Sequence, residues 1–251
     1  MQKTNDGTLR TWSHSDAHFM EDILINVSHE LRTPLAVAKG YATSLLRYDD
    51  RLPHDERVAM VGEIDVACDR LENVITQMLQ TARLMQGTVT LHRHPHDLAH
   101  LTRAAITQVE QATAEAATND HPIIFQHDPS KPVLVLVDER LFTPTLAHLL
   151  ENARNYSLKG LPITVTLQTT GKAAKWSVQD QGIGIAADQL PHIFDPFYRV
   201  ATDLTQEISG LGLGLTFGQR VMALHGGTLQ VASKVGQGSR FWFALPLEAA
   251  T

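Results

Sequence analysis

INVSHELRTPLAV, residues 25–37, places His29 inside an apolar helical pattern and a proline, Pro34, five residues later. Apolar residues recur every four positions through this segment and predict a helix over residues 17–47. Each helical residue turns by about 100°, so the histidine, two positions from its neighbours on the apolar stripe, points roughly 200° away from that stripe. The pattern therefore predicts a solvent-facing imidazole and not a core histidine.

His29 has a hydroxyl and a carboxylate side chain close to it in the predicted helix. Thr33 lies four residues on and shares its face, while Glu30 is close enough to bias the charge and tautomer of the imidazole. Pro34 has no N–H for the carbonyl of Glu30, so we expect the helix to bend or loosen there. Together these residues resemble a nucleophile with a base and a water-orienting hydroxyl. The simpler alternative is an ordinary solvated surface histidine.

A second helix, over residues 56–86, follows a charged turn at 47–56. Its apolar positions alternate steps of three and four, a heptad seam typical of helical bundles. These positions are Val61, Ile64, Cys68, Leu71, Ile75, Met78 and Ala82. Two antiparallel helices cannot bury both stripes against each other, so we expect a symmetric dimer with four helices. The alternative is that both helices pack on the rest of the chain.

The chain changes character near Gly87, where short β-rich runs begin to alternate with helices. Strands are predicted at 88–92, 123–127, 133–137, 163–168, 174–180, 228–233 and 240–246. Helices are predicted at 97–116, with Asp97 as N-cap, at 139–156 and at 212–225. The fold class is thus multidomain, α followed by α+β: a linker over 1–16, a helical hairpin over 17–87, and an α/β sandwich over 88–251.

Composition excludes several classes of protein. The 251 residues carry 21 basic and 27 acidic side chains, a net charge of −6, which argues against nucleic acid as a partner. The single cysteine, Cys68, rules out an internal disulfide framework and fits a reducing compartment. There is no run of about 18 apolar residues and no signal peptide, so we expect a cytoplasmic chain without a membrane segment.

The segment SHELRTPL, residues 28–35, resembles the H box of sensor histidine kinases, the dimerisation and phosphotransfer domain of two-component systems. The resemblance implies that His29 accepts a phosphoryl group and that Glu30 is the general base. It also implies that Thr33 positions water when phosphate is removed from a partner protein. The same family forms homodimers through this hairpin.

A second match supports the first. LLENARNYS, residues 149–157, resembles the N box of the same kinases, which implies that Asn152 holds Mg²⁺ and that Asn155 and Tyr156 lie at the nucleotide. An amide oxygen is a hard ligand that suits Mg²⁺. The chain departs from the pattern twice: Asn155 stands where a basic residue is usual, and His148 replaces the earlier asparagine of the box.

Three more segments resemble the family's nucleotide loops: DQGIGI (180–185), FDPFYR (194–199) and GLGLGL (210–215). The first implies that the Asp180 carboxylate accepts the adenine amine. The glycines let the backbone approach a ligand closely, and the third segment opens a helix whose N–H groups suit phosphate. The site residues implied here are Asp180, Gly182, Gly184, Ile185, Arg199, Gly210, Leu211, Gly212, Leu213 and Gly214. Residues 196–210 are expected to form a lid.

The resemblance, completed by GQGSRFWF at 236–243, implies a Bergerat-type ATP-binding domain. A Rossmann fingerprint is excluded because a polar loop, and no strand, directly precedes GLGLGL, and a P-loop is excluded because no G-K-[ST] follows it. The resemblance implies ATP- and Mg²⁺-dependent autophosphorylation of His29, then transfer to an aspartate on the receiver domain of a response regulator, with phosphatase activity toward that regulator. It also favours the cytoplasmic portion of a membrane-anchored sensor. Two alternatives stay open: an ATPase of the gyrase, chaperone and mismatch-repair kind, and a dimeric nucleotide-binding scaffold with impaired kinase activity.

Overall fold

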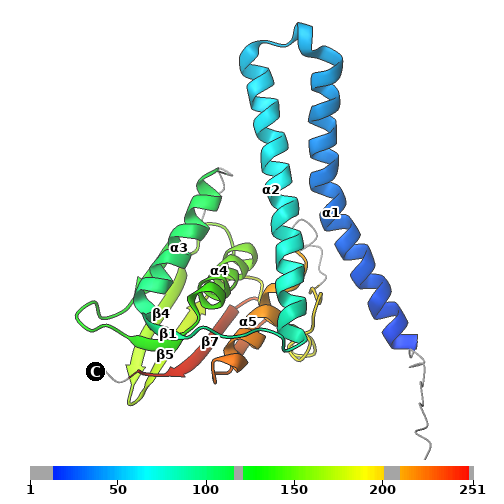
Figure 1. Ribbon diagram of the computed structural model, residues 1–251. Coiled ribbons are helices and arrows are strands. Elements are labelled where there is room, and N and C mark those ends of the chain that lie inside the picture. Colours follow the sequence, from blue (N-terminus) through cyan, green and yellow to red (C-terminus); the bar gives the residue numbers. More distant parts are fainter. Residues whose placement is uncertain (1–13, 116–120, 201–209, 249–251) are drawn as a thin grey trace, which may run out of the picture. The chain divides into compact units, whose positions relative to one another are not determined.

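The computed structural model describes residues 14–115, 121–200 and 210–248 (Figure 1). The chain divides into two compact units, residues 1–75 and 76–251, and each is considered by itself. The division falls inside the second long helix, so unit 2 includes that helix's C-terminal turns. The sequence-based boundaries at residues 16 and 87 remain predictions.

Unit 1 holds most of an antiparallel helical hairpin. Helix α1, His14–Tyr48, is followed by the short 3-10 helix η1, Asp49–Arg51, and by α2, His54–Met85 (Figure 1). The two predicted helices and the turn between them are confirmed. Helix α1 continues through Pro34, and the bend or loosening expected there stays a prediction.

The hairpin leaves large apolar side chains at its surface. Leu46 is 90% exposed, and Leu35 and Val61 are each more than half exposed. A helical hairpin that hides only part of its apolar stripe has surface left for another partner.

Unit 2 is built on a five-stranded sheet in the order β2-β4-β5-β7-β6. Its strands are β2 Ile123–Gln126, β4 Ile163–Thr170, β5 Ala173–Gln179, β6 Gln230–Lys234 and β7 Gly238–Pro246. Only the β2–β4 pair is parallel. A second, two-stranded antiparallel sheet pairs β1, His94–Asp97, with β3, Leu134–Val137.

Three helices pack on the larger sheet. They are α3 Leu98–Glu115, α4 Glu139–Tyr156 and α5 Gly214–Leu224 (Figure 1). Helix α4 lies between α3 and α5 and contacts β5 and β7. The predicted N-cap of α3 is confirmed, since the Asp97 carboxylate accepts the Ala99 N–H at 3.1 Å. The predicted α/β sandwich is confirmed.

One predicted strand is wrong. Residues 88–92 have no regular structure, and the first strand begins at His94. Alternating apolar residues form a strand only where a neighbouring strand is available for backbone hydrogen bonds. Here the His92 N–H is instead donated to the Asp138 side chain, at 2.9 Å. Helix α5 also begins two residues later than predicted, because Gly210 and Gly212 have positive φ values of 145° and 70°.

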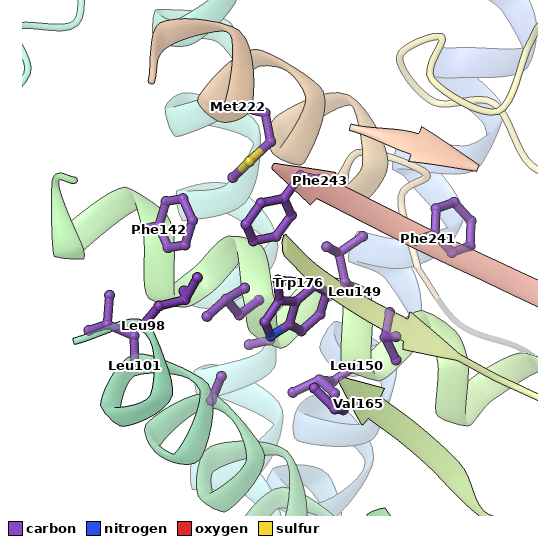
Figure 2. Packing of buried hydrophobic residues seen from close by; sticks show 14 of the residues in the cluster. Leu98, Leu101, Phe142, Leu149, Leu150, Val165, Trp176, Met222, Phe241 and Phe243 are labelled. Atoms are coloured by element: carbon purple, nitrogen blue, oxygen red, sulfur yellow. The ribbon is translucent and has the colours of Figure 1, made fainter. Parts of the chain in front are cut away.

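Aromatic side chains from the sheet and α4 form the centre of the core (Figure 2). Trp176 and Phe243, from adjacent strands, stack with ring centroids 5.2 Å apart, and Phe142 meets Phe243 edge-on at 5.6 Å. The buried indole N–H of Trp176 donates to the Thr102 hydroxyl at 3.1 Å, so the one polar atom of that ring is satisfied by α3. This packing holds α3 and α4 in place against the sheet.

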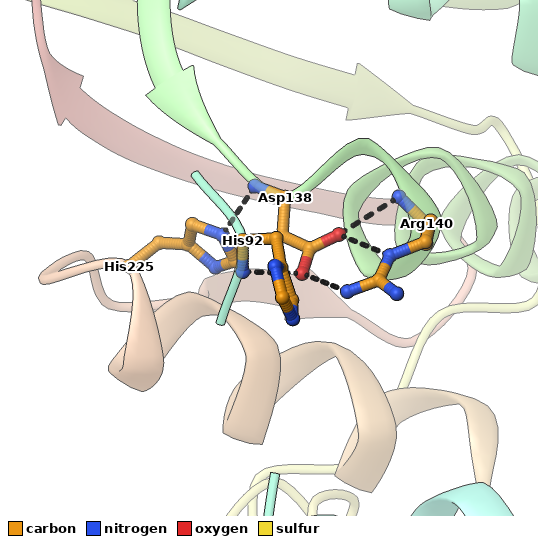
Figure 3. Close-up of polar contacts among 4 residues, drawn as sticks. All are labelled: His92, Asp138, Arg140 and His225. Carbon is orange, nitrogen blue, oxygen red and sulfur yellow. Dashed lines mark hydrogen bonds and ion pairs between the residues drawn. The ribbon is translucent and has the colours of Figure 1, made fainter. Parts of the chain in front are cut away.

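A polar cluster fixes the ends of α4 and α5 that lie together (Figure 3). Asp138, 1% exposed, is the N-cap of α4. Its carboxylate accepts hydrogen bonds from the backbone and guanidinium of Arg140 and from the His92 N–H. The Arg140 guanidinium holds the pKa of this carboxyl well below its usual range.

The same cluster reaches α5 through His225. The Asp138 N–H donates to His225 Nε2 at 2.9 Å, and His225 Nδ1 donates to the Val221 carbonyl at 2.8 Å. The imidazole is therefore neutral with its proton on Nδ1, and burial lowers its pKa, which favours that state. Asp138 at the start of α4 and His225 at the end of α5 thus join the two helices by a direct hydrogen bond.

Candidate active site

His29 lies on the exposed surface of α1, as the helical phase predicts. Thr33 is also exposed, and its hydroxyl donates to the His29 backbone carbonyl at 3.1 Å. The hydroxyl proton is thus held by the backbone while its lone pairs remain available as acceptors. Glu30 is the adjacent, partly buried carboxylate. Unit 1 accordingly presents an accessible imidazole, a carboxylate and a hydroxyl within about one helical turn.

Unit 2 contains a pocket that gathers residues from distant parts of the sequence. Its walls are α4, the loop after β5, residues 193–200, and the glycine-rich start of α5. Every predicted nucleotide residue except Gly182 lines it: Asn152, Asn155, Tyr156, Asp180, Gly184, Ile185, Arg199, Gly210, Leu211, Gly212, Leu213 and Gly214. Residues 201–209 of the predicted lid lie outside the described residues.

Asp180 is placed at the end of β5 with one oxygen left for a ligand. It is 3% exposed, and its Oδ1 accepts the N–H groups of Gly182 and Ser239 at 2.9 and 3.0 Å. Both contacts use Oδ1, so within the described residues Oδ2 remains as an acceptor. Burial raises the pKa of this carboxyl. A carboxylate held in this way suits recognition of an amino group.

The glycines of the 180–185 loop are required by close backbone contacts. A Cβ on Gly182 would lie 1.8 Å from the Tyr156 carbonyl oxygen, so this residue shapes the pocket although it does not line it. Gly184 has φ 69°, and a Cβ there would lie 2.1 Å from the Lys234 carbonyl oxygen. The loop is thereby pressed between the end of α4 and strand β6.

One face of α4 supplies oxygen donors. Glu151 and Asn152 both line the pocket, and burial raises the pKa of the Glu151 carboxyl. Among the described residues no group of three or more His, Cys, Asp or Glu side chains has the arrangement of a metal site. An amide and a carboxylate are still the donors that Mg²⁺ prefers, and it commonly takes its other ligands from phosphates and water. The residues present therefore fit Mg²⁺ bound together with a nucleotide.

The start of α5 suits an anion. Its N-cap residue, Leu213, makes no side-chain capping hydrogen bond, so the first N–H groups of the helix are left to other partners. A Cβ on Gly212 would lie 2.6 Å from the Tyr198 carbonyl oxygen, which ties the glycine turn to the segment before it. Arg199, on that segment, also lines the pocket. Phosphate groups are the natural ligands of such a turn.

Several pocket residues were missed by the sequence analysis. They are Gln77, His148, Glu151, Ile183, Ile193, Tyr198, Val200, Leu215, Ser239 and Phe241. His148 and Glu151 share helical spacing with Asn152 and Asn155, a signal that was available. Ser239 and Phe241 become neighbours only through the pairing of β5 with β7.

Comparison with known families agrees with this geometry. Residues 20–87 match the His Kinase A (phospho-acceptor) domain, and residues 137–249 match the histidine kinase-, DNA gyrase B-, and HSP90-like ATPase. The chain belongs to the sensor histidine kinases. Both domains of a histidine kinase core thus occur here in one chain, with His29 in the first and the pocket in the second.

Two curated histidine kinases illustrate the similarity. Sensor histidine kinase RppB of Synechocystis sp. is 33% identical over 223 residues, which are 88% of this chain and 48% of RppB. Sensor-like histidine kinase SenX3 of Mycobacterium bovis is 30% identical over 225 residues, 90% of this chain and 53% of SenX3. The chain spans about half the length of these relatives. None of its described helices is long and apolar enough to cross a membrane.

Solved structures of histidine kinases share the fold. Full-length ShkA, crystallised with AMPPNP, has a TM-score of 0.63 at 27% identity, covering 92% of this chain and 46% of that one. Histidine kinase AdeS of Acinetobacter baumannii has a TM-score of 0.61 at 19% identity, covering 88% of this chain and 98% of that one. ThkA, solved in complex with the response regulator TrrA, has a TM-score of 0.60 at 19% identity, covering 93% of this chain and 64% of that one.

Proposed function

We propose that this chain is the catalytic core of a sensor histidine kinase, which transfers the γ-phosphoryl group of ATP to His29 and then to an aspartate of a response-regulator receiver domain. The observation that carries the proposal is the pocket of unit 2, where residues from four separate segments meet as a nucleotide site would require. The exposed His29 supplies an acceptor in the same chain.

The chemistry assigned to unit 1 is nucleophilic. An unprotonated imidazole nitrogen of His29 attacks the γ-phosphorus, the bond to the bridging oxygen breaks, and ADP leaves. The Glu30 carboxylate takes the proton that the imidazole sheds. In the phosphatase reaction, which switches the signal off, the Thr33 hydroxyl orients water for hydrolysis of the phosphoaspartate on the regulator. Its exposure on the same face as His29 supports this role.

The pocket residues bind and orient the nucleotide. Asp180 accepts the adenine amine, Asn155 and Tyr156 flank the nucleotide on α4, and Arg199 with the first N–H groups of α5 holds phosphate. Asn152 would hold Mg²⁺, which when bound neutralises phosphate charge during transfer. Catalysis then rests on positioning and on charge compensation.

The helical hairpin is proposed to form a homodimer. Exposed Leu46, Leu35 and Val61 provide apolar surface that a second copy would cover in a four-helix bundle. We infer domains at 17–87 and 88–251, after a linker at 1–16. The chain spans about half the length of its curated relatives. We propose that it is the cytoplasmic portion of a longer, membrane-anchored sensor, as the family resemblance implies.

A second candidate is a dimeric scaffold that binds nucleotide without efficient phosphotransfer. It is favoured by Asn155, which is a neutral side chain at the position where the family's N box has a basic residue. A missing positive charge weakens electrostatic stabilisation of the transferred phosphoryl group.

Incubation with γ-labelled ATP and Mg²⁺ tests the proposal. The wild-type chain should acquire label that survives alkali and is lost in acid, as phosphohistidine does. His29→Gln should abolish labelling, whereas His54→Gln, which changes another exposed histidine of the hairpin, should retain it. Equal labelling of both variants would overturn the assignment of His29. Nucleotide binding without labelling of the wild-type chain would favour the scaffold.

A further inference from the structure

The imidazole of His148 is a polar group of the pocket to which the proposed function gives no role. It lies on α4 one turn before Asn152 and lines the pocket with it. Its Nδ1 atom is buried and has no hydrogen-bond partner in the described part of the chain. Buried polar atoms are nearly always paired, so an orphan in a binding pocket points to a partner that the ligand brings.

Gln77 decides which nitrogen of His148 carries the proton. Gln77 belongs to unit 2 and also lines the pocket, and its Nε2 lies 3.2 Å from His148 Nε2. An amide nitrogen only donates, so His148 Nε2 is the acceptor and the proton is on Nδ1. Burial lowers the pKa of His148 to about 4, so at neutral pH the ring carries one proton only. Nδ1 is therefore a donor without an acceptor.

The first turn of α5 lies against the edge of the ring that bears Nδ1. A Cβ added at Gly214 would be 3.4 Å from the Cβ of His148 and 3.9 Å from Nδ1. Phe217, in the same helix, meets the imidazole edge-on with ring centroids 5.4 Å apart. The orphan donor is thus held beside the uncapped N–H groups of α5, where an anion is favoured.

We propose that His148 donates its Nδ1–H to a phosphate oxygen of the bound nucleotide, and that Gln77 is the positioning residue that selects the tautomer required. This rests on the proposed function, in that a nucleotide must occupy the pocket. Nδ1 is covered by the first turn of α5, so phosphate reaches it when that turn shifts.

A hydrogen-bond donor and a metal ligand at His148 would affect nucleotide binding differently. A neutral Nδ1–H cannot coordinate a metal ion, because its lone pair is committed to the proton. The contact should therefore strengthen binding of ADP with Mg²⁺ and with EDTA alike, and should leave binding of adenosine, which has no phosphate, unchanged.

Calorimetric titration of the full chain with ADP and with adenosine tests the contact. His148→Phe keeps a ring beside Phe217 but removes the N–H, and it should weaken ADP binding about tenfold or more while adenosine binding stays the same. His148→Asn places an amide near the position of Nδ1 and should bind ADP within about threefold of wild type. Tryptophan fluorescence and circular dichroism establish that each variant is folded.

Three outcomes overturn the inference: equal losses of ADP and adenosine binding, a loss seen only with Mg²⁺, or no loss. If His148→Phe does not fold, His148→Asn and His148→Ala are compared in the same way. Failure of the wild-type chain to bind ADP would instead overturn the proposed function itself. The two failures are thus distinguished by the wild-type titration.

The role of Gln77 is tested through the tautomer. Spectra of ¹⁵N-histidine-labelled protein should show His148 protonated at Nδ1, and protonation at Nε2 would overturn the proposal. In Gln77→Glu a carboxylate can only accept, so the proton should move to Nε2 and ADP binding should fall. Gln77→Glu made in the His148→Asn variant, which has no imidazole, measures the effect of charge repulsion alone on ADP binding. An equal loss of ADP binding in that double variant would count against selection of the tautomer by Gln77.

Discussion

Two glycines of unit 2 allow the steric demand of the nucleotide loop to be measured separately from backbone strain. Gly184 and Gly160 have nearly the same positive φ, 69° and 77°. A Cβ on Gly184 would lie 2.1 Å from the Lys234 carbonyl oxygen and 2.6 Å from its carbon, whereas a Cβ on Gly160 would meet nothing within 4 Å. Gly160→Ala is therefore a matched control for Gly184→Ala.

The expected difference follows from these contacts. Both alanines are held in the left-handed region, at a cost of about 1–2 kcal/mol each. In both, alanine also restricts the unfolded chain, which offsets part of that cost equally. Only Gly184→Ala forces the backbone of β6 to move, and overpacking of this kind adds about 1–3 kcal/mol. Because the obstructing atoms are main chain, we expect the upper part of that range.

Urea unfolding of the full chain, followed by tryptophan fluorescence, measures the difference. The buried Trp176 lies in unit 2 and reports on it. Gly184→Ala should unfold at clearly lower urea than Gly160→Ala and should bind ADP more weakly, because residue 184 lines the pocket. Equal destabilisation of the two variants, or a larger effect at Gly160, would refute the steric argument.

Three further predictions concern other parts of the molecule. The pKa of His148 is lowered from 6.5 to about 4, so between these values the unfolded state binds the proton more tightly. At about 1.36 kcal/mol per pH unit, roughly 3 kcal/mol of the free energy of unfolding should be lost as the pH falls from 6.5 to about 4. Urea unfolding at pH 7 and at pH 4.5 measures this loss, and it should be smaller in His148→Asn. Asp138→Ala removes the α4 cap and takes the acceptor from the His92 N–H, so thermal unfolding should show a loss of about 2 kcal/mol or more. That loss should exceed the one caused by Arg140→Met, which leaves the cap and the His92 contact in place. Thr33→Ala should leave labelling by γ-labelled ATP intact but slow dephosphorylation of a phosphorylated regulator, measured by loss of label from that regulator.

Nearly all the residues that the resemblance assigns to the nucleotide line one pocket, and they lie in short segments that each carry a recognisable pattern. The sequence shows glycines at residues 182 and 184, but the backbone that requires them belongs to Tyr156 and Lys234, which are distant along the chain. The helical phase placed His29 at the surface, as found. That helical phase depends only on neighbours within one or two turns of the chain.

Features that depend on distant partners could not be predicted. The strand expected at 88–92 fails because pairing is decided by geometry elsewhere, and the His92 N–H bonds to the Asp138 carboxylate. The contact between Asp138 and His225 joins residues that are 87 positions apart. Gln77 lies in an ordinary heptad pattern, and nothing local indicates its contact with His148.

The Asp138 cluster bears on how chimeric kinases should be assembled from this chain. Residue 92 enters the cluster through its main-chain N–H alone, so its side chain is free to vary and only proline is forbidden there. Arg93, in contrast, uses its guanidinium to reach the Leu224 carbonyl at the end of α5. A fusion joint placed before residue 92 keeps both contacts with the nucleotide-binding unit, whereas a joint after residue 93 would lose both and leave the Asp138–His225 hydrogen bond to join α4 and α5.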